Sequence, residues 1–328
     1  MEISDYEVAI AELPKQKQDR LKNCPSPGQG VNPWIFSTAL SLTSYFEDDD
    51  IIEILEAFVS CDGREREILR AVVRAREIAN GEEGGGSLLR ALWPVVDYTM
   101  VHKTVIDCPV RLKDLGRLSP VNVERERPMT EEILETLFPG NPLLCFGRTP
   151  YSFSTRPREY WRGSRESDFQ FIVPNPMIKE TGVGKDGKES KRCLANTGPR
   201  RFLVTEFDIS EKSEEWGPYV RDWKAKGISV LDANVALILE LARRGLPRLP
   251  LALAVYSGGK SIHGWFPCEG ITDEQLRPFM DRAVRLGADR ATWTKCQLVR
   301  MPDGTRENGV RQQVHFFAPE VIRVKGGA

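Results

Sequence analysis

Histidine is scarce in this sequence, and none of its cysteines forms a CxxC pair. The three histidines stand at positions 102, 263 and 315, and the seven cysteines are dispersed along 328 residues. Structural zinc sites require closely spaced cysteine and histidine ligands, and an odd number of scattered cysteines does not favour a disulfide framework. We therefore expect neither a structural zinc ion nor a scaffold of disulfides.

Long apolar runs are also missing. The longest, around 235 to 241, is interrupted by Glu240, whereas a membrane helix needs roughly 18 uncharged apolar residues. The first residues are acidic and carry no apolar segment of the kind found in secretory signals. The sequence accordingly predicts a cytoplasmic protein that does not engage the membrane.

The chain lacks an excess of positive charge and a Walker phosphate-binding motif. Its formal net charge is -1 and its pI about 6.4, so bulk charge does not indicate nucleic-acid binding, although the strip from 282 to 311 is basic. Without the GxxxxGK[ST] spacing the chain has no signature of a nucleotide-driven motor. Any unwinding of DNA would have to come from a separate helicase.

Apolar positions divide the chain into a helical part and a mixed part. Between 33 and 79 they recur at helical spacing, which predicts three helices, and the glycine-rich stretch 81–86 reads as a linker. We therefore expect an N-terminal helical accessory module with its linker at 1–86 and a second domain at 87–328.

The second domain shows strand and helix signals in alternation, which predicts an α+β fold with mixed or antiparallel sheets and flanking helices. Threonines, at 130 and 272, are expected to cap two of its helical segments. The expected helices are 130–139, 230–245 and 272–287, the expected strands are 143–147, 169–174, 201–209, 251–257, 297–302 and 314–317, and a hairpin turn is expected at 181–190.

Two acids stand two positions apart on one of these strands. Because side chains alternate along a strand, Glu206 and Asp208 point to the same face, and two carboxylates so close repel unless a positive charge joins them. Oxygen ligands suit Mg²⁺ or Mn²⁺. The alternative is a strand end whose acids simply face solvent.

The segment SGGKSIHGWF follows the next apolar strand. Its paired glycines allow close backbone approach to a ligand, Lys260 offers a positive charge to a phosphate, and Ser261 and His263 share one strand face. A tight hairpin with a solvated lysine and a structural histidine is the competing interpretation.

A third cluster occupies 287 to 313. Asp289 follows a helix and offers a further carboxylate, unless it only ends that helix, whereas Asp303 lies in a PDG turn and is expected to be structural. Basic side chains suited to a triphosphate or a template backbone accompany them, namely Lys295, Arg300, Arg306 and Arg311.

Taken in order, these three motifs resemble those of the archaeo-eukaryotic primase superfamily, in particular the primase-polymerases of phages, plasmids and organelles. That superfamily has an acid pair on one strand, then a serine-x-histidine strand, then a further aspartate. Here the matching residues are Glu206 with Asp208, Ser261 with His263, and Asp289. The resemblance covers about 200 to 317, and it departs from many members in having glutamate before aspartate in the first motif.

The resemblance implies a catalytic domain with an RRM-like core and two-metal-ion nucleotidyl transfer, possible without a primer. Glu206, Asp208 and Asp289 would be the catalytic and metal-binding acids. The implied partners are a single-stranded DNA template, a primer and nucleoside triphosphates. The nucleotide would be bound by Lys260, Ser261, His263 and Arg300, with Lys295 and Arg306 as further members.

Other functions compete with this one. The chain is alternatively a catalytically silent replication-initiation or DNA-binding protein on a primase fold, or a nuclease-like metalloenzyme. A relaxase needs a histidine cluster, which three dispersed histidines do not supply. The helical module at 1–86 either helps to bind template or acts as a cap or partner-docking module, and it carries no stripe of aromatic and basic residues.

Overall fold

The computed structural model of the chain describes residues 10–11, 13–25, 31–59, 64–79, 93–162, 165–184 and 187–322. It is a mixed α+β protein whose strands pair antiparallel, as the sequence predicted. Two compact units are present, residues 1–93 and 94–328, so the division falls after Trp93 where the sequence placed it after Gly86. No helix among the described residues has the length and apolarity needed to cross a membrane.

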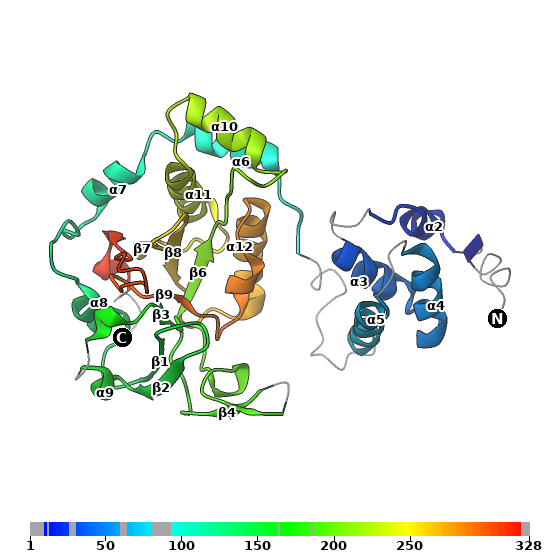
Figure 1. The fold of residues 1–328 in the computed structure, drawn as a ribbon, viewed down its shortest axis with the longest axis horizontal. Helices are drawn as coiled ribbons and strands as arrows, with labels where there is room; N and C mark the ends of the chain where they lie inside the picture. The colour runs from blue at the N-terminus through cyan, green and yellow to red at the C-terminus, as the bar shows by residue number, and fades with distance from the viewer. Residues whose placement is uncertain are drawn as a thin grey trace. The chain divides into compact units, whose positions relative to one another are not determined.

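The first unit is helical (Figure 1). It contains α2 (Lys15–Lys22), α3 (Val31–Leu42), α4 (Asp48–Phe58) and α5 (Glu65–Ala79). The three helices expected after residue 33 are confirmed, whereas α2 was not predicted. Arg76 of α5 joins its neighbours, because it pairs with Asp48 at 2.6 Å and donates hydrogen bonds to the carbonyls of Thr43 and Phe46. The acidic first turn of α4 is favoured by the helix dipole.

The second unit contains two four-stranded antiparallel sheets. The first sheet has the order β2-β1-β3-β9 and the second has the order β10-β7-β8-β6. The strands of the first are β1 (Leu143–Gly147), β2 (Phe153–Pro157), β3 (Phe171–Ile172) and β9 (Val299–Arg300). Those of the second are β6 (Phe202–Glu206), β7 (Leu253–Tyr256), β8 (Ile262–Pro267) and β10 (Val314–Phe317). The hairpin expected at 181–190 is present as β4 (Gly182–Val183) and β5 (Glu189–Ser190).

Helices accompany the sheets. The longer ones begin at capping side chains, since Ser229 accepts a hydrogen bond from the Asp232 N–H and Thr272 from the Gln275 N–H. The helix α11 approaches β8 closely, because a Cβ at Gly264 would lie 2.9 Å from Ile238 of that helix. The helices are α6 (Tyr98–Asp107), α7 (Leu112–Leu118), α8 (Thr130–Leu137), α9 (Arg158–Arg162), α10 (Gly217–Ala225), α11 (Val230–Arg244) and α12 (Asp273–Arg285). The described residues also form short 3-10 turns, namely η2 (Glu166–Asp168), η3 (Leu194–Asn196), η4 (Arg290–Trp293) and η5 (Pro319–Val321).

Both sheets contribute to one hydrophobic core. Phe146 and Ile172 of the first sheet are buried in the same cluster as Phe202 and Trp265 of the second. The rings of Phe202 and Trp265 meet edge to face, with centroids 5.6 Å apart. The shared core fixes the two sheets against each other, and it thereby determines which strand ends come together at their junction.

The connection from β9 to β10 carries the chain from one sheet to the other, and Asp303 holds it. This residue is fully buried and has a φ of 55°, a left-handed conformation that aspartate tolerates better than most residues. Its carboxylate accepts hydrogen bonds from the N–H groups of Met129 and Val314 and pairs with Arg311 at 2.9 Å. The turn expected at Asp303 is present, and its side chain joins three distant segments.

Candidate active site

The site is built around Glu206, the last residue of β6. In the antiparallel register of β6 and β8, Glu206 lies directly opposite His263. The Ser261 hydroxyl donates a 2.8 Å hydrogen bond to Oε1 of Glu206, and Nε2 of His263 lies 3.3 Å from Oε2. The strand pairing therefore brings the first two motifs of the sequence into contact.

The Glu206 carboxylate is held in its ionised form. Burial by itself would raise its pKa, but nearby His263, the hydrogen bond from Ser261 and the charge of Arg300 together lower the pKa to about 2. The ordinary value is 4.5. Glu206 is thus a carboxylate anion throughout the physiological pH range and is ready to bind a cation.

This shift predicts a pH-dependent contribution to stability. Because the folded-state pKa lies below the unfolded one, ionised Glu206 stabilises the fold above about pH 4.5, and that stabilisation is lost as the pH falls toward 2. The advantage of wild type over Glu206→Gln should shrink across this window by up to about 3 kcal/mol. Urea unfolding from pH 2 to 7 measures it, and a pH-independent difference would contradict the assigned pKa.

Asp208 lies two residues beyond Glu206 and outside β6, because this strand ends at Glu206 and not at 209 as the sequence predicted, and the intervening Phe207 is buried. Its Oδ1 lies 2.6 Å from Nζ of Lys260, and the two side chains are 61% and 59% exposed. An exposed pair of this kind exchanges partners readily, because water screens it. The acid pair thus consists of a largely buried carboxylate at Glu206 and an accessible one at Asp208.

The backbone of Asp289 lies beside the backbone of Glu206. Its N–H donates a 2.8 Å hydrogen bond to the Glu206 carbonyl, and its side chain accepts one from the Ala291 N–H at 2.9 Å, capping η4. Gly287, two residues earlier, has a φ of 93° and lies against Trp216, since a Cβ there would be 2.7 Å from that ring. Among the residues that the structure describes, no three His, Cys, Asp or Glu side chains are arranged to hold a metal ion together.

Two arginines reach the site from the chain after η4. The Arg300 N–H donates a 3.4 Å hydrogen bond to Nδ1 of His263, so β9 of the first sheet meets β8 of the second here. The Arg300 guanidinium lies over the Phe171 ring, 4.5 Å from its centroid. Burial lowers the pKa of Arg300, as does the charge of Arg306, while Glu206 opposes the shift. Arg306 itself donates to the Gly258 carbonyl at 3.1 Å.

Two buried donors at this junction lack hydrogen-bond partners. Within the described part of the chain, neither Nη1 of Arg300 nor Nε2 of His263 makes a hydrogen bond, although the latter is close to the Glu206 carboxylate. An unpaired buried donor is costly, so its presence calls for a ligand that satisfies it. Both groups are suited to an anionic oxygen.

Lys295 is not part of this group, contrary to its expected place among the nucleotide-binding residues. Its Nζ lies 3.8 Å from Asp273, which also pairs with Arg200 at 3.1 Å. Arg200 lies two residues before the start of β6, whereas Glu206 ends it, so Lys295 lies at the opposite end of that strand. Spacing along 287–313 could not reveal this, because the chain after η4 runs back along β6 before it enters β9.

Arg311 is also engaged elsewhere. It pairs with Asp303 and donates hydrogen bonds to the carbonyls of Arg125, Glu126 and Arg127, so it fastens a loop and does not face the site. Phe171 and Trp216, in contrast, were not anticipated. The only signal for Phe171 was its place in an apolar strand, and Trp216 carried none.

Comparisons with protein-family models, with curated proteins and with solved structures found no match for this chain.

Proposed function

We propose that the protein is a template-dependent nucleotidyltransferase, a DNA primase-polymerase. The observation that supports this most directly is the grouping of an ionised Glu206 with Ser261 and His263 beside Arg300, whose buried Nη1 has no hydrogen-bond partner among the described residues. A transferase of this kind must hold polyphosphate and cations together, which needs carboxylates and anion-binding donors side by side. The candidate site offers both.

The donor set fits magnesium or manganese. Glu206, Asp208 and Asp289 supply only carboxylate oxygens, and such ions are commonly held by one or two carboxylates completed by substrate phosphates. When bound, a pair of such ions would favour attack by a 3′-hydroxyl and neutralise the leaving pyrophosphate. The residues would hold the ions only if Asp208 released Lys260 and Asp289 released its helix cap.

His263 acts in this proposal as a hydrogen-bond donor. Its Nδ1 accepts the backbone N–H of Arg300, so a ring proton lies on Nε2, which faces the Glu206 carboxylate at 3.3 Å. Nε2 in this form does not remove a proton from a hydroxyl, and it would donate to a phosphate oxygen by turning from the carboxylate. Arg300, Lys260 and Arg306 add positive charge around the same oxygens.

A nucleotide-addition assay tests the proposal. The wild-type protein is incubated with Mn²⁺ or Mg²⁺, a single-stranded DNA template and labelled nucleotides, with and without an annealed primer. We expect template-dependent products, which disappear when the template is omitted or the cations are chelated. Cleavage of the template would indicate a nuclease instead, and retention of DNA without any product would indicate a binding protein.

A second candidate is a catalytically silent replication-initiation or DNA-binding protein on a primase fold. The observation that favours it is that two of the three acids already have protein partners, Asp208 with Lys260 and Asp289 with the Ala291 N–H. In that case the donors at Arg300 and His263 would contact the DNA backbone. Retention of DNA that is insensitive to chelation would support this alternative.

A further inference from the structure

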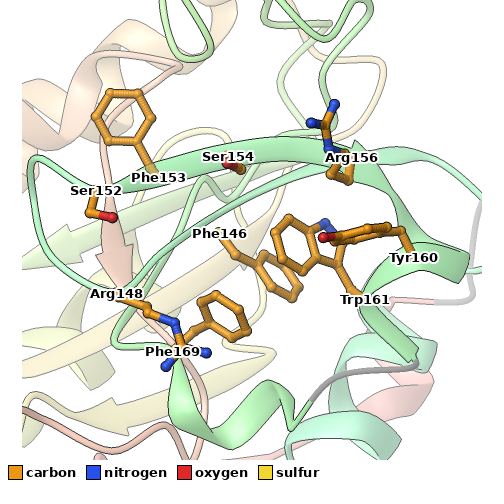
Figure 2. A pocket seen from close by; sticks show the side chains of 9 residues that line it. All are labelled: Phe146, Arg148, Ser152, Phe153, Ser154, Arg156, Tyr160, Trp161 and Phe169. Atoms are coloured by element: carbon orange, nitrogen blue, oxygen red, sulfur yellow. The ribbon is translucent and has the colours of Figure 1, made fainter.

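A second concave site lies on the first sheet, in a cavity of about 510 Å³. Figure 2 shows four aromatic rings gathered on one side of β2, while Phe153 points to the other side. The cavity is lined by aromatic, serine and arginine side chains, namely Phe146, Arg148, Ser152, Phe153, Ser154, Arg156, Tyr160, Trp161 and Phe169.

The strand register separates this cavity from the candidate active site. Ser154 pairs with Phe146, and these two share a face. Gly147, the next residue of β1, pairs with Phe171, which in turn pairs with Arg300. Since neighbouring residues of a strand point to opposite faces, Phe146 and Ser154 lie on the face away from Phe171 and Arg300. Phe153, which pairs with Gly147, reaches the cavity from the other side of the edge strand β2.

The floor and one wall of the cavity are aromatic. Phe146 stacks on Trp161 with centroids 4.6 Å apart, and Phe169 meets Trp161 edge to face at 5.2 Å. At the rim, Tyr160 stands edge-on to Trp161 at 5.1 Å and remains 62% exposed. The Arg156 guanidinium lies 5.9 Å from the Tyr160 centroid, and a flat ring system that entered the cavity would pack against the exposed part of the Tyr160 ring.

Polar groups flank the aromatic floor. Arg148 is exposed, its guanidinium lies 4.8 Å from the Phe169 centroid, and it pairs with no carboxylate in the described part of the chain. The Gln170 side chain holds the backbone here by donating a 2.6 Å hydrogen bond to the Arg148 carbonyl. No described group hydrogen-bonds to the hydroxyls of Ser152 and Ser154. Arg156 is less available, because it pairs with Glu180.

We propose that this cavity binds a nucleobase of a single-stranded nucleic acid, with an adjacent phosphate at Arg148. A base offers a flat face for Tyr160 and polar edges for the serine hydroxyls, and its phosphate complements the unpaired guanidinium. The volume lies in the range of small-molecule sites, roughly 300 to 1,000 Å³. A free nucleotide has the same chemistry; the choice of single-stranded DNA as its source rests on the proposed function.

The test uses the full chain and a fluorescent single-stranded oligonucleotide that carries one 5-iododeoxyuridine. Anisotropy gives the affinity, and irradiation followed by peptide mass spectrometry locates the base. We expect a cross-link to the peptide around Tyr160 and Trp161. Loss of stacking in Tyr160→Ala should weaken binding roughly ten-fold. Tyr160→Phe, which keeps the ring, should bind like wild type.

Matched variants outside the cavity serve as controls. Tyr151 is another exposed tyrosine at 93%, so Tyr151→Ala should leave both readouts unchanged. Arg148→Ala should weaken binding and reduce its salt dependence. Arg117→Ala should not, although Arg117 is also an exposed arginine, at 81%. Unlabelled deoxynucleoside monophosphate is added as a competitor, and effective competition would make a free nucleotide the source.

The result that would overturn the proposal is a cross-link confined to other peptides, or equal affinity for Tyr160→Ala and wild type. Its failure is distinguishable from failure of the proposed function. Nucleotide addition without the Tyr160 cross-link would reject only the cavity. A cross-link that depends on Tyr160 in a protein without nucleotide addition would keep the cavity and reject the transferase.

Discussion

Asp208→Ala is expected to reduce the rate of template-dependent nucleotide addition by at least about 10³-fold, since several kcal/mol of charge stabilisation depend on each cation ligand. Asp208 is the accessible member of the acid pair, and its loss leaves Glu206, at the end of β6, as the remaining carboxylate of the pair. The free energy of unfolding of the Asp208→Ala variant should differ from that of wild type by no more than about 0.5 kcal/mol, because the Asp208 side chain is 61% exposed. Rates of primer extension, together with urea unfolding curves, measure both effects.

Asp107→Ala is the matched control. Asp107 is 59% exposed and pairs with Lys103 at 2.6 Å, so its surroundings are close to those of Asp208 with Lys260. It lies at the end of α6, and we expect full activity in this variant. Unchanged extension by Asp208→Ala would reject the assignment of the acid pair, and an equal loss in both variants would show that the effect is not specific to the site.

Asp303→Ala is expected to lower the free energy of unfolding by about 3–5 kcal/mol, because it leaves two backbone donors without their acceptor and removes the buried carboxylate that pairs with the half-buried Arg311. The carboxylate is fully buried and binds the N–H groups of Met129 and Val314 together with Arg311. Its left-handed backbone also suits alanine less well than aspartate. Chemical unfolding at neutral pH gives the difference directly.

A surface pair of the same chemistry is the comparison for Asp303. Asp281 pairs with Arg277 at 2.7 Å and is 36% exposed, so Asp281→Ala should cost no more than about 1 kcal/mol. Asp303→Asn keeps an acceptor oxygen but loses the charge, and it should lie between wild type and Asp303→Ala. A cost for Asp303→Ala as small as that for Asp281→Ala would show that the carboxylate is not what holds the connection.

Local signals in the sequence predicted the elements of the site well. An apolar run predicted the strand that ends at Glu206, and an amphipathic pattern predicted α11. The cap expected at Thr272 is confirmed, whereas Thr130, also expected to be a cap, lies inside α8 after Met129. The resemblance to the primase superfamily led to the expectation that Glu206 lies near Ser261 and His263, and the pairing of β6 with β8 brings these residues together. These features depend on neighbours in the chain or on one strand pairing.

The parts that were missed depend on contacts between distant segments. Lys295 and Arg306 looked equivalent in the sequence, but one pairs with Asp273 and the other lies against the loop at Gly258. Strand β2 and helices α6 and α7 were not predicted, since short apolar runs with proline and glycine carry little periodicity. The orientation of Asp289 likewise depends on a helix cap that only the folded turn defines.

The main-chain hydrogen bond from Asp289 to Glu206 fixes the position of the Asp289 backbone but not the direction of its side chain. The α-carbon of Asp289 is fixed beside β6 whatever its side chain does, so only rotation about side-chain bonds decides whether its oxygens face the cap or the neighbouring acids. Giving up such a cap costs about 0.5–2 kcal/mol. The Asp289 side chain can therefore change direction at a small cost in free energy while the backbone around it stays fixed. Substituting Asp289 should leave that backbone in place.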